Sequence, residues 1–207
     1  MSQRWAGVDV GAAKGFDVAV IDGESLVAEP RRITDHLEVV RWLQAYAPRV
    51  VAVDSPRSPA PRGERSRSCE RDLVRAGVCG IRYTPNLAVL RANQSYYAWI
   101  LSGFRLYEAL EQAVGILEWE IIECFPTATW SRLGERKGTQ RSRARWSREV
   151  LEGLRLAGLP RRMNQDARDA IGAAVTARLY DGGATQSFGE IVVPKPGGPA
   201  GPSAHTS

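Results

Sequence analysis

The stretch Gly7-Val8-Asp9-Val10-Gly11, close to the N-terminus, decides how the rest of the chain is interpreted. The surrounding residues, 5–10, have the composition of a β-strand, and this strand carries one carboxylate just before it reaches a glycine. An acid near a strand end is well placed for chemistry, because loops diverge there and ligands bind in the space between them. Asp9 is therefore the first candidate site residue.

Further acids lie at the ends of later apolar segments. Asp54 ends the run Val50-Val51-Ala52-Val53, and Glu123 follows Ile121-Ile122. Asp166 and Asp169 are spaced to share one face of a helix. Clustered carboxylates raise one another's pKa unless a cation neutralises them, and oxygen ligands favour magnesium or manganese over zinc. The working hypothesis is that these acids converge around a divalent metal.

Each of these acids also has a purely structural interpretation. Asp54 precedes Ser-Pro and fits the start of a turn, and Asp166 fits the first turn of a helix, where the dipole favours a carboxylate. Asp169 fits a surface ion pair with an arginine, and Glu123 fits a hydrogen bond to the next turn. Taken singly, these interpretations are favoured for every acid except Asp9. Their common placement at the ends of predicted strands and helices favours a shared functional site.

Periodicity and turn signals predict an α/β fold. The first three strands, joined by short turns, should be antiparallel, and a helix crossover then leads to a buried strand that ends at Asp54. A mixed sheet of this kind, antiparallel and then parallel with helices on its faces, is the ribonuclease-H-like arrangement. Strands are expected at 5–10, 16–21, 25–33, 49–53, 116–124 and, as an edge strand, 191–193. Helices are expected after Thr34 or Asp35 up to Pro48, at 70–76, at 86–114 with a break near Gly103, from a Thr127 cap to 133, at 142–157 and at 164–180.

The length of 207 residues predicts one domain, residues 1–193, followed by a flexible tail at 194–207. No apolar window approaches the roughly 18 residues that span a membrane, and the N-terminus shows no apolar signal-peptide core, so we expect a cytoplasmic protein without a membrane partner. The three cysteines form no Cys-x-x-Cys pair, and there are only two histidines. This composition argues against zinc binding and against Cys–His or Ser–His–Asp catalysis.

The net charge is +5, and nearly all the cations are arginines. Two segments concentrate them: 130–148, with Trp130 and Trp146 at its ends, and 57–75, directly after Asp54. Such segments hold phosphates, and aromatic rings stack on unpaired bases. A solvated helix face with two core tryptophans is an equally good interpretation. The residues expected to contact nucleic acid are Arg57, Arg62, Lys137, Arg141, Arg143 and Arg145.

Four stretches together resemble the family catalogued as domain of unknown function 429. They are Gly7-Val8-Asp9-Val10-Gly11, Val53-Asp54-Ser55-Pro56 with Cys69-Glu70-Arg71 downstream, Glu123-Cys124-Phe125-Pro126-Thr127, and Asp166-Ala167-Arg168-Asp169-Ala170. The resemblance covers about residues 5–193, and its Glu-x-x-Pro and Asp-x-x-Asp-Ala stretches are the most specific parts. It implies a ribonuclease-H-like nuclease fold.

The resemblance also implies roles for the acids. The wider superfamily includes Holliday-junction resolvases, which use an acid on the first strand, an acid on the fourth strand and an acid pair on a late helix. By that analogy Asp9, Asp54 and Asp169 bind Mg²⁺ or Mn²⁺. Asp166 would be a further ligand or the hydrogen-bonding partner of one, and Glu123 would be a family-specific catalytic addition.

The expected function is therefore a metal-dependent nuclease that hydrolyses phosphodiester bonds of DNA or RNA by two-metal-ion chemistry. Two alternatives stay open. Asp9-Val10-Gly11 followed by Lys14-Gly15 also resembles the phosphate-binding hairpin of an ATP-binding, kinase-like domain of the actin-like superfamily. A non-catalytic nucleic-acid-binding protein of the same fold is the other alternative. The partners of Asp9 discriminate among these functions, and the oligomeric state is left open.

Overall fold

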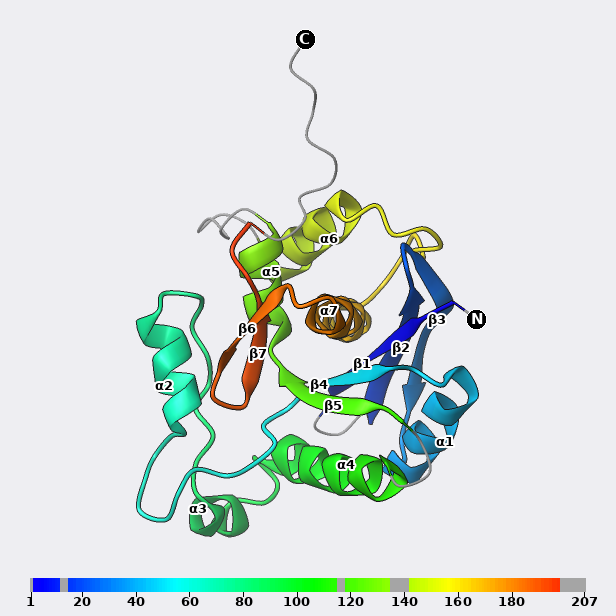
Figure 1. Cartoon of the computed structure of the whole chain (residues 1–207). Helices are drawn as coiled ribbons and strands as arrows, with labels where there is room; N and C mark the ends of the chain where they lie inside the picture. The colour runs from blue at the N-terminus through cyan, green and yellow to red at the C-terminus, as the bar shows by residue number, and fades with distance from the viewer. Residues whose placement is uncertain (1, 12–14, 115–117, 135–141, 198–207) are drawn as a thin grey trace.

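The structure is a computed structural model that describes residues 2–11, 15–114, 118–134 and 142–197 (Figure 1). In chain order its elements are β1 (Arg4–Val10), β2 (Phe16–Asp22), β3 (Ser25–Ile33), α1 (His36–Tyr46), β4 (Val50–Asp54), α2 (Ser68–Arg75), α3 (Leu87–Ala92), α4 (Ala98–Val114), β5 (Glu120–Cys124), α5 (Pro126–Leu133), α6 (Arg143–Gly153), α7 (Gln165–Asp181), β6 (Thr185–Phe188) and β7 (Ile191–Pro194).

The strands form one seven-stranded sheet in the order β3-β2-β1-β4-β5-β7-β6. The pairs β1–β2 and β2–β3 are antiparallel, whereas β4, β5 and β7 continue the sheet in parallel from β1. The last pair, β6–β7, is antiparallel. This topology confirms the predicted ribonuclease-H-like α/β fold. It also places β1 in the interior of the sheet, between β2 and β4, so Asp9 has a strand on either side.

Helices cover both faces of the sheet (Figure 1). On one face, α7 packs with α5 and α6 over a core that includes Trp5, Ala19, Ala52 and Trp130. On the other face, α1 and α4 pack over residues such as Val8. Alternating side chains of each strand serve the two cores, because successive residues of a strand point to opposite faces.

Helix α7 lies unusually close to the sheet. Its small residues, among them Ala170 and Ala174, are fully buried, and they face Gly7 of β1. A Cβ atom built on Gly7 would lie 2.1 Å from the carbonyl oxygen of Ala170. Only glycine fits this contact, and it brings the first turns of α7 over the end of β1.

The predicted helix at 86–114 is wrong in one respect. Two helices occupy this range, α3 and α4, and the chain turns between them at residues 93–97 instead of breaking near Gly103. Gly103 lies inside α4 for a packing reason, since a Cβ atom there would lie 1.9 Å from Ser55 Oγ. The glycine lets α4 approach the loop that follows β4.

The C-terminal strands also differ from the prediction. Residues 191–194 form β7, which lies between β5 and β6, so the edge strand is β6. The ordered chain continues past residue 193, because Lys195 donates its backbone N–H to the carbonyl oxygen of Ala184. Most of the predicted tail, residues 198–207, lies outside the described residues. Helix α5 begins at Pro126, with Phe125 in the cap position expected for Thr127.

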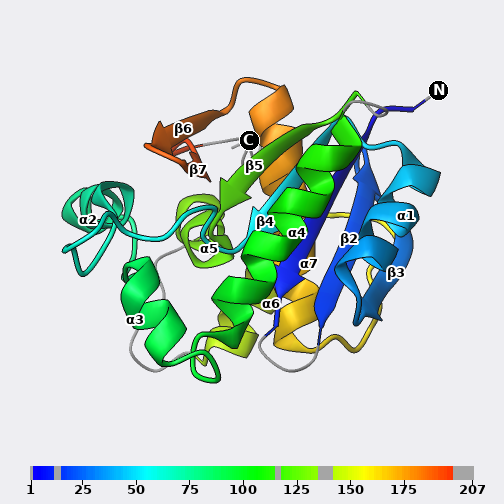
Figure 2. The same cartoon turned by 90° about the horizontal axis from the view of Figure 1, so that it is seen from below.

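The excursion between β4 and α4 extends away from the sheet and carries α2 and α3 (Figure 2). Cys69 and Leu73 of α2 pack against Ile191 and Val193 of β7 in a separate small core. Within the described residues, no helix is both long and apolar enough to cross a membrane.

Candidate active site

A row of carboxylates crosses the sheet near the ends of β2, β1 and β4. Asp9 of β1 pairs in register with Asp17 of antiparallel β2 and with Asp54 of parallel β4. Paired residues on neighbouring strands point to the same face of a sheet. Ala19 and Ala52, each two residues away along its strand, belong to the core under α7, so the three aspartates point to the α7 face.

Helix α7 adds two more acids above this row. Asn164 caps the helix by accepting the backbone N–H of Ala167 through its side-chain oxygen at 2.7 Å, which fixes where the first turn begins. Asp166 lies in that turn and Asp169 follows it. Carboxylate oxygens of Asp9, Asp17 and Asp166 lie within 4.8 Å of one another. The acids from the sheet and from the helix thus form one cluster.

Arg32 of β3 supplies a cation at one side of the cluster. Its guanidinium donates from Nε and Nη2 to Asp17 Oδ2 at 2.9 and 2.7 Å. The same Nη2 donates to Asp166 Oδ2 at 2.9 Å. Arg32 therefore bridges the sheet acid to the helix acid. Its hydrogen bond to Asp17, together with the charges of both acids, holds the pKa of the guanidinium above its usual value.

Asp9 and Asp54 form the least compensated part of the cluster. Burial, followed by the charges of Asp169 and Asp166, raises the pKa of Asp9 to about 7. Burial and the charge of Asp9 raise the pKa of Asp54 well above its usual value. Without a metal, the pair retains a proton near neutral pH.

Asp169 is buried and held by three donors. Its Oδ1 accepts from Trp130 Nε1 at 3.0 Å and from Gln165 Nε2 at 2.9 Å, and its Oδ2 accepts from Arg143 Nη2 at 2.9 Å. Its charge nonetheless contributes to the raised pKa of both Asp9 and Asp54. The structure thus brings Asp9, Asp54, Asp166 and Asp169 together, as the sequence predicted, and adds Asp17.

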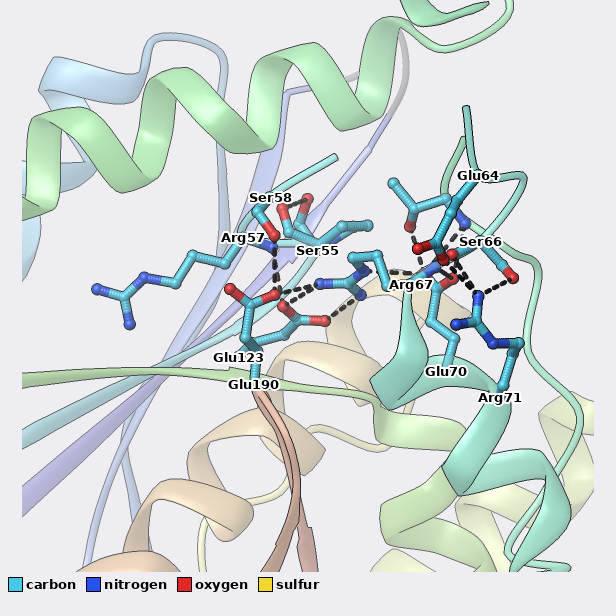
Figure 3. Close-up of polar contacts among 12 residues, drawn as sticks. Ser55, Arg57, Ser58, Glu64, Ser66, Arg67, Glu70, Arg71, Glu123 and Glu190 are labelled. Carbon is cyan, nitrogen blue, oxygen red and sulfur yellow. Dashed lines mark hydrogen bonds and ion pairs between the residues drawn. The ribbon is translucent and has the colours of Figure 1, made fainter. Parts of the chain in front are cut away.

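Glu123 lies apart from this cluster. It pairs in register with Val53, the residue before Asp54, and therefore points to the opposite face of the sheet from Asp54. Arg67 donates two hydrogen bonds to it, from Nη1 to Oε2 at 2.7 Å and from Nη2 to Oε1 at 2.6 Å (Figure 3). The backbone N–H of Arg57 donates to Oε2 at 2.8 Å. In this arrangement Glu123 anchors the loop after β4.

Arg67 is the centre of a buried ionic network (Figure 3). It is only 4% exposed and also donates to Glu70, at 3.1 Å, and to Glu190, at 3.0 Å. Glu70 is fully buried and accepts the backbone N–H of Thr84 as well. The network joins α2, the end of β5 and the turn before β7.

Most of the predicted phosphate-binding arginines are paired with acids. Arg57 pairs with Glu111 at 2.6 Å, and Arg145 pairs with Glu149 at 2.8 Å on the surface of α6. Arg143 is 46% exposed and reaches from α6 to Asp169.

Other predicted cations divide into three groups. Arg62 and Arg65 are exposed in the loop before α2. Arg71 and Arg75 of the same basic segment pair with Glu64 and Asp72. Lys137 and Arg141, like Lys14 of the hairpin on which the ATP-binding alternative rests, lie outside the described residues.

Comparisons with known proteins identify the family. The model of the family described as "Protein of unknown function (DUF429)" matches residues 7–192. The chain belongs to the DUF429 family. No curated protein matches the sequence of this DUF429 chain.

Solved structures resemble the chain at low identity. Thermus thermophilus RuvC is 17% identical, with a TM-score of 0.47 over 87% of this chain and 97% of RuvC. The same RuvC in complex with a Holliday junction substrate is 18% identical, with a TM-score of 0.48 over 86% of this chain and 94% of RuvC.

The chemistry of the acid cluster in this DUF429 protein fits a hard divalent cation. All donors in the cluster are carboxylate oxygens, the ligands preferred by magnesium and manganese. Burial and then the charges of Asp169 and Asp166 raise the pKa of Asp9, and a bound cation would oppose this repulsion. Zinc sites usually include histidine or cysteine ligands, whereas the cluster among the described residues consists of aspartates.

Two residues of the cluster, Asp17 and Arg32, were missed by sequence reasoning. A signal for Asp17 was present, because Gly11 and Gly15 close the β1–β2 hairpin, with the Gly11 N–H donating to the Gly15 carbonyl at 2.9 Å. Asp9 and Asp17 lie two residues outside these glycines and must pair in a regular hairpin. Arg32 gave no comparable signal, since its position depends on the β-bulges between β2 and β3.

Proposed function

We propose that this protein is a divalent-metal-dependent nuclease that hydrolyses phosphodiester bonds of nucleic acid. The observation that carries the proposal is the in-register row of Asp17, Asp9 and Asp54 beneath the two acids of α7. Buried, mutually repelling carboxylates destabilise a fold, so a cluster of this kind favours a role that recruits a cation.

Asp9, Asp54 and Asp169 are the proposed metal ligands, and the geometry adds Asp17 and Asp166 as further carboxylates within reach of Asp9. A bound pair of magnesium or manganese ions would supply Lewis acidity and an activated water for in-line displacement at phosphorus. Trp130 and Gln165 keep the carboxylate of Asp169 oriented. Arg143 is half exposed beside it and is the nearest cation proposed to hold a substrate phosphate.

Arginines on either side of the acid cluster are suited to binding an anionic polymer. Two cavities flank the row of acids: one, of about 530 Å³, includes Asp54 and Arg143, and the other, of about 310 Å³, includes Asp17 and Arg162. An extended phosphodiester chain that passes along the row would therefore meet an arginine at either end. Arginine suits this role because its planar fork matches phosphate oxygens.

The test is cleavage of a panel of single-stranded, duplex, branched and RNA–DNA hybrid substrates, with Mg²⁺, Mn²⁺ or EDTA present. We expect metal-dependent cleavage that Asp9→Asn abolishes while the circular dichroism spectrum and the melting cooperativity are retained. Full activity of Asp9→Asn would overturn the metal site. Salt-sensitive binding without cleavage would favour the non-catalytic alternative, and ATP hydrolysis without nucleic-acid cleavage would favour the kinase-like one.

A further inference from the structure

The larger of the two flanking cavities has features that the acid cluster does not explain. It lies at the C-terminal ends of β4 and β5 and has a volume of about 530 Å³, within the range of roughly 300–1,000 Å³ typical of small-molecule pockets. Its walls come from the loop after β4, the start of α2, residues 80–82, the start of α4, the end of β5 and α6. Asp54 belongs both to this cavity and to the acid row.

Three aromatic residues line the cavity. Trp99 at the start of α4, Phe125 after β5 and Trp146 of α6 all line it. Trp99 and Phe125 are half-buried, so each presents part of its ring to the cavity or to solvent. Aromatic rings on the path of a nucleic acid act as stacking platforms, because every base has a π-face.

Charge decides which part of a nucleotide enters. Arg67, Glu70 and Glu123 line the inner wall, and in their network three carboxylates, with Glu190, surround one guanidinium. That excess of negative charge repels a phosphate but not a neutral base. Arg82 and Arg143 line the same cavity. Both are exposed, whereas Arg67 of the ionic network is buried. A phosphate would therefore stay by these arginines, while a neutral base would enter the cavity.

We infer that this cavity binds a single unpaired nucleobase next to the scissile phosphate, and that the protein therefore acts on nucleic acid with an unstacked nucleotide. This inference rests on the proposed nuclease function and specifies its substrate class. A base inside a continuous duplex is stacked and paired, so it reaches a side cavity only after extrusion from the helix. Single strands, flaps and branch points present such a base at lower cost.

The test measures binding in EDTA, so that it is independent of cleavage. The probes are a single-stranded oligodeoxynucleotide and the same strand with one central abasic site, each fluorescently labelled. We expect the intact strand to bind about tenfold tighter than the abasic strand, a factor within the range expected for stacking of one base on an aromatic ring. Trp99→Leu, which keeps an apolar side chain but removes the ring, should abolish this difference, and Trp99→Phe should retain most of it.

Tyr96→Leu is the matched control, because Tyr96 is 61% exposed, lies three residues before Trp99 and does not line the cavity. Arg82→Gln keeps the fold intact at an exposed position and should weaken both probes equally. Equal binding of both probes by the wild type, or an unchanged difference in Trp99→Leu, would overturn the inference. If either of these results came with metal-dependent cleavage, the nuclease proposal would stand and only the base-binding inference would fail. If binding depended on the base but no cleavage occurred, the base-binding role of the cavity would stand and the nuclease proposal would fail.

Discussion

Asp9 of β1 and Asp54 of β4 lie opposite each other in register on adjacent parallel strands, beneath helix α7. Burial and neighbouring charges raise the pKa of Asp9 to about 7, against a model-peptide value of about 3.9. Between these two values the folded protein binds a proton that the unfolded chain has released. The free energy of unfolding therefore falls as pH rises from about 4 to about 7.

Binding of a divalent metal should restore the free energy of unfolding that is lost as pH rises. Because a metal binds only deprotonated carboxylates, Mn²⁺ should raise the melting temperature more at pH 8 than at pH 5. Differential scanning calorimetry of the wild type and Asp9→Asn, in EDTA and in Mn²⁺, measures both effects. We expect Asp9→Asn to melt higher than the wild type in EDTA at pH 8 and to lose most of the Mn²⁺ response. An equal Mn²⁺ shift in the variant would contradict this account.

Removing Arg32 should increase the affinity for metal. The guanidinium of Arg32 occupies oxygen atoms of Asp17 and Asp166, and it therefore competes with a cation at this side of the cluster. Arg32→Gln should bind Mn²⁺ several-fold tighter by isothermal titration calorimetry, with a lower melting temperature in EDTA. Arg31→Gln is the matched control, since its exposed side chain pairs with Glu38 away from the acids. Weaker Mn²⁺ binding by Arg32→Gln would show instead that Arg32 organises the ligands.

The parts of the site that could be predicted from sequence are those that local rules determine. Asp9 and Asp54 end buried strands, and the crossover through α1 makes those strands parallel neighbours, so their proximity follows from element order. The spacing of Asp166 and Asp169 defines a helix face. Metal binding and catalysis by these residues stay predictions, as does nucleic-acid contact by the arginines.

What sequence reasoning missed depends on non-local geometry. Glu123 has the same local signal as Asp54, but its register with Val53 directs it to the opposite face. Arg67 belongs to the basic segment 57–75 that was expected to hold phosphates, whereas it is buried against carboxylates 56 and 123 residues away. The turn at 93–97 was hidden because apolar residues on both sides keep a helical spacing across it.

Loss of Arg67 should destabilise the fold strongly. Arg67→Met leaves the carboxylates of Glu70 and Glu123 buried without their cation, which costs roughly 3–5 kcal/mol. Arg75→Met, at a 76% exposed side chain paired with Asp72, should cost about 0–1 kcal/mol. Urea unfolding at pH 8 measures both values.

The loss in free energy of unfolding caused by Arg67→Met should depend on pH, which tests whether uncompensated charge is its cause. Burial already raises the pKa of Glu123, and Arg67 is the main group that lowers it. Without Arg67 the folded-state pKa rises further, so the variant loses more stability than the wild type as pH increases. The deficit should therefore be smaller at pH 5 than at pH 8. A deficit that does not change with pH would indicate lost packing instead of an uncompensated charge.

The distance between β1 and α7 should control the acid cluster. In Gly7→Ala the new methyl group would overlap the backbone of α7 at Ala170, so the helix must move away from Asp9. Overpacking of this kind costs typically about 1–3 kcal/mol. Gly153→Ala, at an open position in helix α6, should instead stabilise by roughly 0.5–1 kcal/mol. If α7 must lie close for Asp166 and Asp169 to join the strand acids, Gly7→Ala should also bind Mn²⁺ more weakly while Gly153→Ala binds it normally. Unchanged Mn²⁺ affinity in a folded Gly7→Ala protein would separate metal binding from the α7 acids.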